Sequence, residues 1–224
     1  MGGTRLGVVV GTSVRNEEVF ENGRLAQIAE LRARMEAMGA TVPGHAVIEL
    51  LAGVPGLPRR AVTSMNECPA LAVELIAQAS GSGLFVAVVG WPELVLTSAL
   101  EGRGAADNVL IIPDPGPDPL HVVGLLAEHM DLVMYRTAAV TVSPTRARPL
   151  MAKVREGTAA LVTVGTRLPS PALTLAGRVV GFRGIGRGSG RITSVVLDVR
   201  AETKTRRDRA TTLYLGEQPT LRAV

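Results

Sequence analysis

The turn at residues 64–69 carries the residues whose types and spacing first suggest chemistry. It joins a β-type run at 60–64 to a helical pattern at 69–79, which is where an α/β nucleotide-binding domain keeps its phosphate loop. Such a loop needs glycines to present N–H groups, a lysine for the phosphates and a hydroxyl for magnesium. The turn has no glycine and no lysine. It consists of Ser64, Met65, Asn66, Glu67, Cys68 and Pro69.

Two residues of this turn oppose phosphate binding directly. Pro69 removes a backbone donor, and Glu67 would repel an incoming phosphate. The β-type run at 130–136 ends in Arg136, where a metal-holding acid is expected, and its acid Asp131 lies at the opposite end. We therefore predict a pseudo-ATPase without catalytic residues, nucleotide cofactor or metal.

Other catalytic groupings are absent from the sequence. His45, His121 and His129 lack metal-ligand spacing, and Cys68 at a predicted helix start has no identifiable histidine partner, which favours a small buried residue. Asp114 and Asp118 fit turn and cap roles.

Composition excludes several protein classes. The chain has 224 residues, 46% of them hydrophobic but only 3% aromatic, which predicts one aliphatic core. No apolar run reaches the length of about 18 residues that a membrane helix needs. One cysteine excludes an internal disulfide. We expect a cytoplasmic protein.

Apolar strands alternate with helices in the middle of the chain, which predicts an α/β fold with a mainly parallel sheet flanked by helices. Strands are expected at 60–64, 84–89, 108–112, 132–135 and 159–164. Helices are expected at 69–79, 92–100, 118–128 and 143–156, the last two capped by Asp118 and Ser143, with Pro149 kinking or delaying the last. Residues 175–182 and 192–199 predict a C-terminal antiparallel hairpin across a glycine-rich tip.

This pattern divides the chain into four parts. Residues 1–22 are expected to be a flexible leader, 23–59 an N-terminal helix and a connector with a short helical piece at 47–51, 60–200 the core domain, and 201–224 a basic tail with one edge strand at 211–215. The N-terminal helix has an apolar stripe that either covers the domain's own core or docks on a neighbouring subunit. The stripe contains Leu25, Ile28, Leu31 and Met35.

The basic residues near the C-terminus are a second candidate surface. They could bind an acidic partner or a phosphate backbone, or form a solvated edge. They are Arg200, Lys204, Arg206, Arg207 and Arg209.

Four segments together resemble the ImuA family in its actinobacterial form. They are Val86-Ala-Val-Val-Gly-Trp-Pro-Glu-Leu94, Asn108-Val-Leu-Ile-Ile-Pro-Asp-Pro-Gly-Pro-Asp118, Met130-Asp-Leu-Val-Met-Tyr-Arg136 and Gly181-Phe-Arg-Gly-Ile-Gly-Arg-Gly-Ser-Gly-Arg-Ile192. The resemblance runs from about residue 25 to 199.

The resemblance implies a RecA-like core that lacks nucleotide-binding motifs. It places the lost phosphate loop at 64–70, Glu93 one position from the water-activating acid of RecA-like ATPases, and the recombinase DNA-binding loops at the short segments 137–142 and 165–171. It also implies a role in SOS-induced mutagenesis at the nucleoid, with the Y-family-like protein ImuB and a DnaE-type error-prone polymerase as partners in translesion DNA synthesis.

By the same resemblance, the C-terminal basic residues are candidates for binding ImuB, and the stripe at 25–38 for self-association or docking on RecA. The two loop segments are short, which argues against RecA-type filament binding to single-stranded DNA; direct DNA binding of another kind stays open. A SulA-like cell-division inhibitor that binds FtsZ is the alternative, since SulA also has a RecA-like core without a phosphate loop.

Overall fold

The computed structural model describes residues 47–186, 189–203 and 209–216. The leader at 1–22, the stripe of Leu25, Ile28, Leu31 and Met35, and His45 all lie outside these ranges, as do Lys204, Arg206 and Arg207. The compact unit that contains the described residues begins at His45.

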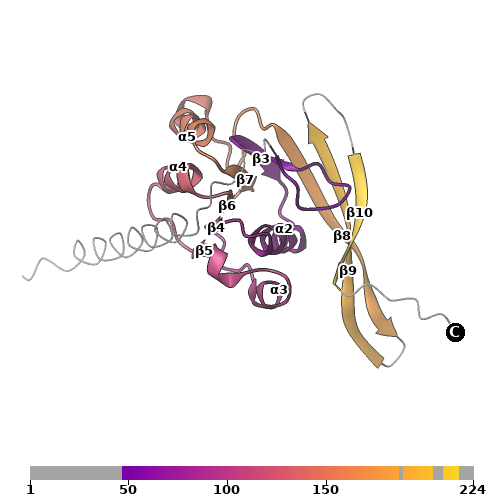
Figure 1. Ribbon diagram of the computed structural model, residues 1–224. Coiled ribbons are helices and arrows are strands. Elements are labelled where there is room, and N and C mark those ends of the chain that lie inside the picture. Colours follow the sequence, from indigo (N-terminus) through magenta and orange to yellow (C-terminus); the bar gives the residue numbers. More distant parts are fainter. Residues whose placement is uncertain (1–46, 187–188, 204–208, 217–224) are drawn as a thin grey trace, which may run out of the picture. The chain divides into compact units, whose positions relative to one another are not determined.

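An eight-stranded sheet forms the centre of this unit (Figure 1). Its strand order is β10-β9-β8-β3-β7-β6-β4-β5. All pairings from β8 to β5 are parallel, whereas β9 pairs antiparallel with β8 and β10 pairs antiparallel with β9. The strands are β3 (Ala61–Met65), β4 (Val86–Val89), β5 (Val109–Ile112), β6 (Leu132–Arg136), β7 (Ala160–Val164), β8 (Leu173–Gly186), β9 (Ser189–Thr203) and β10 (Arg209–Gly216).

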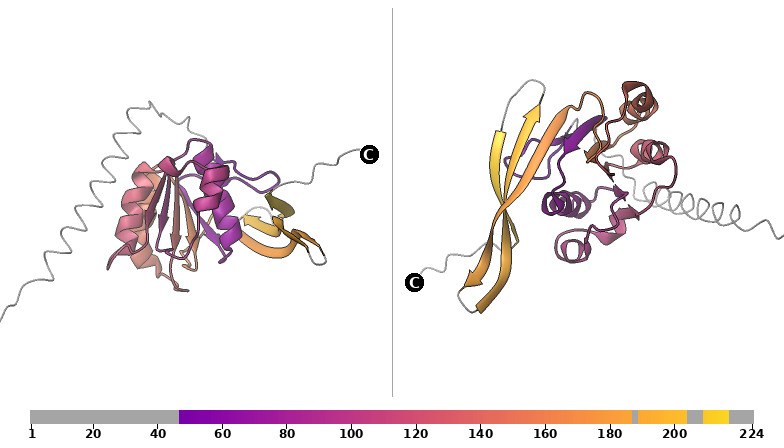
Figure 2. Two further views of the ribbon diagram at one scale, coloured as in Figure 1. Left: turned by 90° about the horizontal axis from the view of Figure 1, so that it is seen from below. Right: turned by 180° about the vertical axis from the view of Figure 1, so that it is seen from behind.

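Helices cover both faces of the parallel part of the sheet. In Figures 1 and 2, α4 (Pro119–His129) and α5 (Pro144–Glu156) lie on one face, and α2 (Pro69–Gly81) and α3 (Thr97–Gly102) lie on the other. A short 3-10 helix, η1 (Ala106–Asn108), precedes β5. Burial on both faces explains why β4 and β7 are apolar along almost their whole length and have no exposed residue. The predicted α/β class with a C-terminal antiparallel hairpin is confirmed.

Helix α2 is buried on most of its sides because it lies between the parallel sheet and the ribbon of β8, β9 and β10 (Figure 1). Leu71 and Leu75 of this helix share one core cluster with Leu175 of β8 and Leu197 of β9. The ribbon thus closes the core over α2.

Helix starts follow the predicted capping chemistry at α4 and α5. The Asp118 carboxylate accepts from the His121 N–H at 3.4 Å, and the Ser143 hydroxyl accepts from the Arg146 N–H at 3.4 Å. Helix α5 continues through Pro149 to Glu156. None of the helices in the described ranges is long and apolar enough to cross a membrane.

Two local predictions were wrong. The helical piece expected at 47–51 is a strand and a turn, because β1 (Val47–Ile48) pairs antiparallel with β2 (Leu57–Pro58) and buries Ile48 and Leu57 in the core. The helix expected at 92–100 begins only at Thr97, after an irregular segment that places Leu96 in the core.

Candidate functional site

The loop between β3 and α2 lies at the carboxyl edge of the parallel sheet, where β3 is flanked by β7 and β8. Open α/β sheets bind their ligands at this edge. The loop is therefore the place to ask whether a nucleotide could be held.

Asn66 ties this loop to β8. Its Oδ1 accepts from the Gly177 N–H at 2.8 Å, and its Nδ2 donates to the Gly177 carbonyl at 2.9 Å. Its own backbone N–H donates to the Leu175 carbonyl at 3.3 Å. A phosphate loop keeps its N–H groups free for the ligand, but this donor is already engaged by the sheet.

Gly177 is required for this close approach. A Cβ at this position would lie 2.9 Å from the Cys68 Sγ and 2.9 Å from the Leu71 Cδ2. Cys68 is itself buried and has a free thiol. The sulfur therefore packs between the loop and the ribbon, as predicted for a small buried residue.

Among the remaining residues of the turn, Ser64, Met65 and Pro69 have structural positions and Glu67 carries a charge. Met65 is buried in the core, and Ser64 is half-buried on β3. Pro69 begins α2, and no side chain caps the N-terminus of this helix. Only Glu67 presents a charged group to solvent.

Arg136 at the end of β6 bridges two carboxylates at this edge. Its Nη2 lies 3.1 Å from the Glu67 Oε1, and its Nη1 lies 3.4 Å from the Glu93 Oε2. Glu67 follows β3 and Glu93 follows β4, so the three residues span the ends of strands on both sides of β7. This trio of Glu67, Arg136 and Glu93 is called the edge ion cluster below. Two carboxylates around one guanidinium would repel a polyphosphate.

The sequence indicated only the missing acid at the end of β6 and did not predict the ion pairs of Arg136. The resemblance placed Glu93 one position from the water-activating acid of RecA-like ATPases, and the structure pairs it with Arg136. A usable signal was present, since opposite charges follow strands that end at one edge of the sheet.

Asp131, at the other end of β6, has a structural role. Its carboxylate lies 2.9 Å from the Arg59 Nη2 and accepts from the Phe85 N–H at 3.0 Å. This pair lies at the amino ends of the strands, whereas the edge ion cluster lies at their carboxyl ends.

A groove of about 710 Å³ opens beside the edge ion cluster. It lies between α2, the segment 91–95, α3 and the ribbon strands β9 and β10. Its apolar lining includes Val73, Trp91, Leu94, Val95, Ile192, Val195 and Leu215. The volume falls within the range typical of ligand pockets, about 300–1,000 Å³.

Glu74 and Arg103 form a second ion pair along this groove. The Glu74 side chain is only 4% exposed, and its two oxygens lie 2.7 Å from the two terminal nitrogens of Arg103. Gln78 also donates to this carboxylate at 2.9 Å. The bidentate pair fixes α3 against α2, and the sequence analysis did not identify it.

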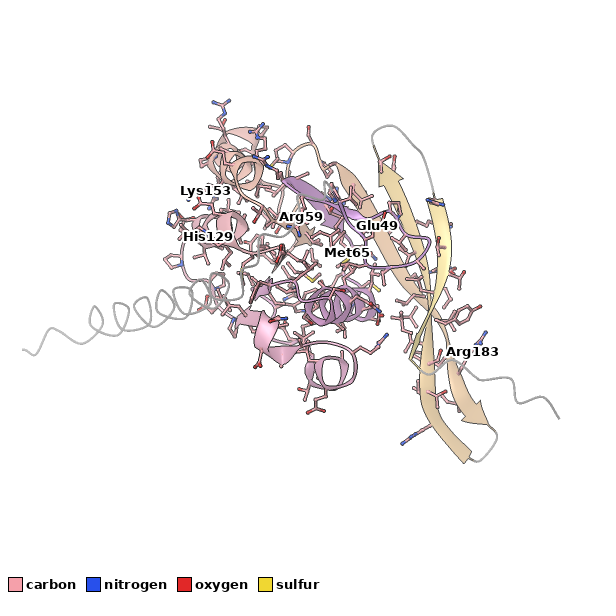
Figure 3. The ribbon with its side chains drawn as sticks, in the orientation of Figure 1. Glu49, Arg59, Met65, His129, Lys153 and Arg183 are labelled. Atoms are coloured by element: carbon pink, nitrogen blue, oxygen red, sulfur yellow. The ribbon has the colours of Figure 1, made fainter. Side chains whose placement is uncertain are left out.

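The histidines do not build a site in the described ranges. His129 lies at the end of α4 beside Glu128, with 3.7 Å between the Nε2 and the nearer oxygen. Figure 3 shows it on the same side as Lys153 of α5, whose Nζ lies 2.7 Å from Glu128. Among the residues that the structure describes, no group of three His, Cys, Asp or Glu side chains is placed to hold a metal ion.

The segments at 137–142 and 165–171 are tied to each other. Thr141 forms a parallel bridge with Arg167, the Val142 N–H donates to the Arg167 carbonyl at 3.1 Å, and the Arg167 N–H donates to the Val140 carbonyl at 2.9 Å. The two segments therefore form one small paired unit at the carboxyl edge.

The C-terminal basic residues lie along the ribbon rather than in a tail, as far as the described ranges reach. Arg200 is exposed on β9, and Arg209 is exposed at the start of β10. The edge strand expected at 211–215 is found as part of β10, which pairs with β9 from Arg209 to Gly216. On the same ribbon, the guanidinium of Arg183 lies over the Tyr214 ring, 4.3 Å from its centroid.

Comparisons with known proteins agree with this architecture. A model of the MT3502 N-terminal domain family matches residues 49–170, which include the edge ion cluster but not the ribbon. The uncharacterized protein Rv3395c of Mycobacterium tuberculosis (strain ATCC 25618 / H37Rv) is 29% identical over 194 residues, covering 82% of this chain and 95% of that protein. The crystal structure of the RadB recombinase aligns with a TM-score of 0.51 at 12% identity, covering 77% of this chain and 94% of that one. The fold is thus RecA/RadB-like, as predicted.

Proposed function

The chain belongs to the MT3502 N-terminal domain family, and we propose that it is an ImuA-type protein, a non-catalytic RecA-like adaptor in damage-induced mutagenesis. In this role it binds an ImuB-like Y-family protein at the nucleoid and reaches a DnaE-type polymerase through it. The observation that carries the proposal is the edge ion cluster at the place of a phosphate loop. The ImuA resemblance of the four quoted segments supplies the identity of the partners.

Three features of one edge argue against nucleotide chemistry. The backbone N–H of Asn66 is engaged by β8, Pro69 offers no donor, and the acid expected at the end of β6 is replaced by Arg136. A Lys–phosphate contact and a bound magnesium each stabilise the transition state of hydrolysis by several kcal/mol in ordinary ATPases. Without both, we expect neither tight nucleotide binding nor turnover.

Calorimetry of the full chain with ATP and magnesium tests this expectation. We expect no heat of binding at millimolar nucleotide. The Arg136→Asp variant is the sharper test. It returns an acid to the end of β6 but leaves the turn at 66–69 unchanged, so we expect no heat of nucleotide binding from this variant either. A micromolar affinity of the natural chain would overturn the pseudo-ATPase assignment.

Co-purification with an ImuB-like protein tests the adaptor role. The ribbon argues for substitution rather than removal of the basic residues, because deleting 200–224 would also delete β10. Arg200→Ser with Arg209→Ser should lower recovery of the partner, and Arg148→Ser, at an exposed position on α5, is the control. Equal recovery with all variants would exclude the basic ribbon as the contact. Inhibition of FtsZ polymerisation by the chain would instead favour the SulA-like alternative.

A further inference from the structure

We propose that the groove between α2, α3 and the ribbon binds an extended peptide segment of another protein, with apolar side chains in the groove and a basic side chain at the edge ion cluster. The inference rests on the adaptor role, because it names the kind of segment that such an adaptor would hold. It concerns a different surface from Arg200 and Arg209.

Apolar side chains are unusually exposed on two walls of this groove. Val95 is 75% exposed in the segment before α3, and Ile192 is 51% exposed on β9. Trp91 is buried between these walls, and Val73 and Leu94 are partly buried. Exposed apolar side chains that converge on one concave surface mark binding sites, whereas single ones do not.

The charges of the groove select a basic segment. Its lining contains three carboxylates, Glu67, Glu74 and Glu93, and two guanidinium groups, Arg103 and Arg136, so its net charge is −1 in a chain of +4. Both arginines are already paired with these carboxylates. Glu67 and Glu93 are the exposed members, each with one carboxylate oxygen facing Arg136, and their other oxygens are acceptors for a lysine or arginine of the segment. A nucleic acid would be repelled here.

The ribbon favours an extended conformation of the bound segment. Strand β10 ends at Gly216, opposite Ser194, and Gly216 has a φ of 110°. Beyond this point, Gly190 of β9 pairs with Ile185 of β8, and residues 191–193 lie opposite a register irregularity between Arg183 and Ile185; no described residue pairs with the other edge of this stretch. Ile192 and Thr193, on this stretch of β9 that no other described strand covers, line the groove. An unpaired strand edge beside an apolar groove is the geometry that binds peptides by strand addition.

Selection from a random peptide library displayed on phage tests the proposal with the full chain as bait. The Val95→Asp variant serves for counter-selection, because a side chain so exposed can be replaced without disturbing the core. Enriched peptides should alternate apolar and polar residues and carry a lysine or arginine near one end. Their binding, measured by fluorescence anisotropy of labelled synthetic copies, should weaken at least about tenfold in Val95→Asp and in Ile192→Asp.

A matched control and a charge swap make the test specific. Ile111 is 46% exposed on β5, at the opposite edge of the sheet, and Ile111→Asp should leave peptide binding unchanged. Glu93→Lys, at another exposed position, should weaken binding of the basic peptides and favour copies in which the basic residue is glutamate. This reversal does not depend on the apolar variants, so it remains informative if one of those fails to fold.

Two results would overturn the groove assignment. One is no enrichment over the Val95→Asp counter-target, and the other is enriched peptides that bind all variants equally. If ImuB co-purification persists in Val95→Asp and Glu93→Lys while peptide binding is absent, the adaptor role stands and the groove inference fails. If peptides bind the groove but no ImuB-like protein is recovered with the natural chain, the adaptor role fails and the groove inference stands.

Discussion

The Arg136 guanidinium lies 3.1 Å from the Glu67 carboxylate, across the end of β7, so an ion pair joins the turn before α2 to the end of β6. The Arg136 side chain is partly buried and both of its acidic partners are exposed. The pair therefore positions these side chains at the edge of the sheet more than it stabilises the fold, since ion pairs that face water contribute little free energy.

Replacing Arg136 by alanine should consequently lower the free energy of unfolding by no more than about 1 kcal/mol. The loss should shrink in high salt, because screening weakens the attraction that the variant removes. Urea unfolding at low and high ionic strength measures both values, with Arg148→Ala as the control for loss of an exposed arginine. A loss of several kcal/mol that ignores salt would contradict this account.

Substitution of Asn66 should separate the two halves of its contact with Gly177. Asn66→Ala removes both hydrogen bonds and should cost about 1 kcal/mol of unfolding free energy. Asn66→Asp should cost more, because a carboxylate oxygen then faces the Gly177 carbonyl in place of the Nδ2 donor. Chemical denaturation gives the order, and equal stability of the two variants would mean that the contact with Gly177 is not maintained.

Gly177→Ala should destabilise the protein by about 1–3 kcal/mol, because its Cβ would overlap the Cys68 Sγ and the Leu71 Cδ2. Cys68→Ala removes one of these atoms. The double variant should therefore recover part of the loss, which a double-mutant cycle of unfolding free energies measures. Strictly additive effects would show that the sulfur is not the obstacle.

Loss of Arg103 should be costly, because it leaves the buried Glu74 carboxylate without its charge partner. We expect Arg103→Ala to lower the unfolding free energy by about 3 kcal/mol. Adding Glu74→Gln should restore part of it, since an amide needs no cation. Thermal and urea unfolding of the two variants provide the comparison, and further loss in the double variant would refute this reading.

The phenol of Tyr135 should ionise at unusually high pH. Burial raises the pKa of Tyr135 above 10.0, although a hydrogen bond with Thr137 and the charge of Arg146 act in the other direction. The folded state therefore keeps the Tyr135 proton to a higher pH than the unfolded state does. The stability that the neutral phenol contributes is complete below the unfolded-state pKa and falls as the pH rises above that value. In Tyr214→Phe, Tyr135 is the only tyrosine, and its ultraviolet absorbance titration should have a midpoint above 10. A midpoint at the free-tyrosine value in a folded sample would refute it.

The strands of the parallel sheet could be predicted because burial on both faces makes them continuous apolar runs. The two-residue strands β1 and β2 could not, because a segment rich in glycine and proline has no measurable periodicity. The helix was expected to begin at residue 92, but the chain first brings Trp91 and Leu96 into the core and forms the helix later.

For the candidate site, the sequence predicted only the loss of phosphate binding. The sequence shows which phosphate-binding groups are missing, since these are local. It does not show that Arg136 meets Glu67 and Glu93, because that depends on the order of β3, β7, β6 and β4 in the sheet. The groove is lined by residues more than 100 positions apart in the chain, such as Glu93 and Ser194.

The position of β3 at the middle of the sheet also constrains how the protein folds. This strand comes early in the chain, yet it pairs with β7 from residue 160 and β8 from residue 173. During synthesis, β3 and the apolar helix after it must wait for about a hundred more residues before either neighbour exists, at a rate of roughly 5–20 residues per second. Such long-range pairing slows folding and exposes apolar surface meanwhile. Recovery of this protein from expression should therefore depend on translation rate, temperature and chaperone supply.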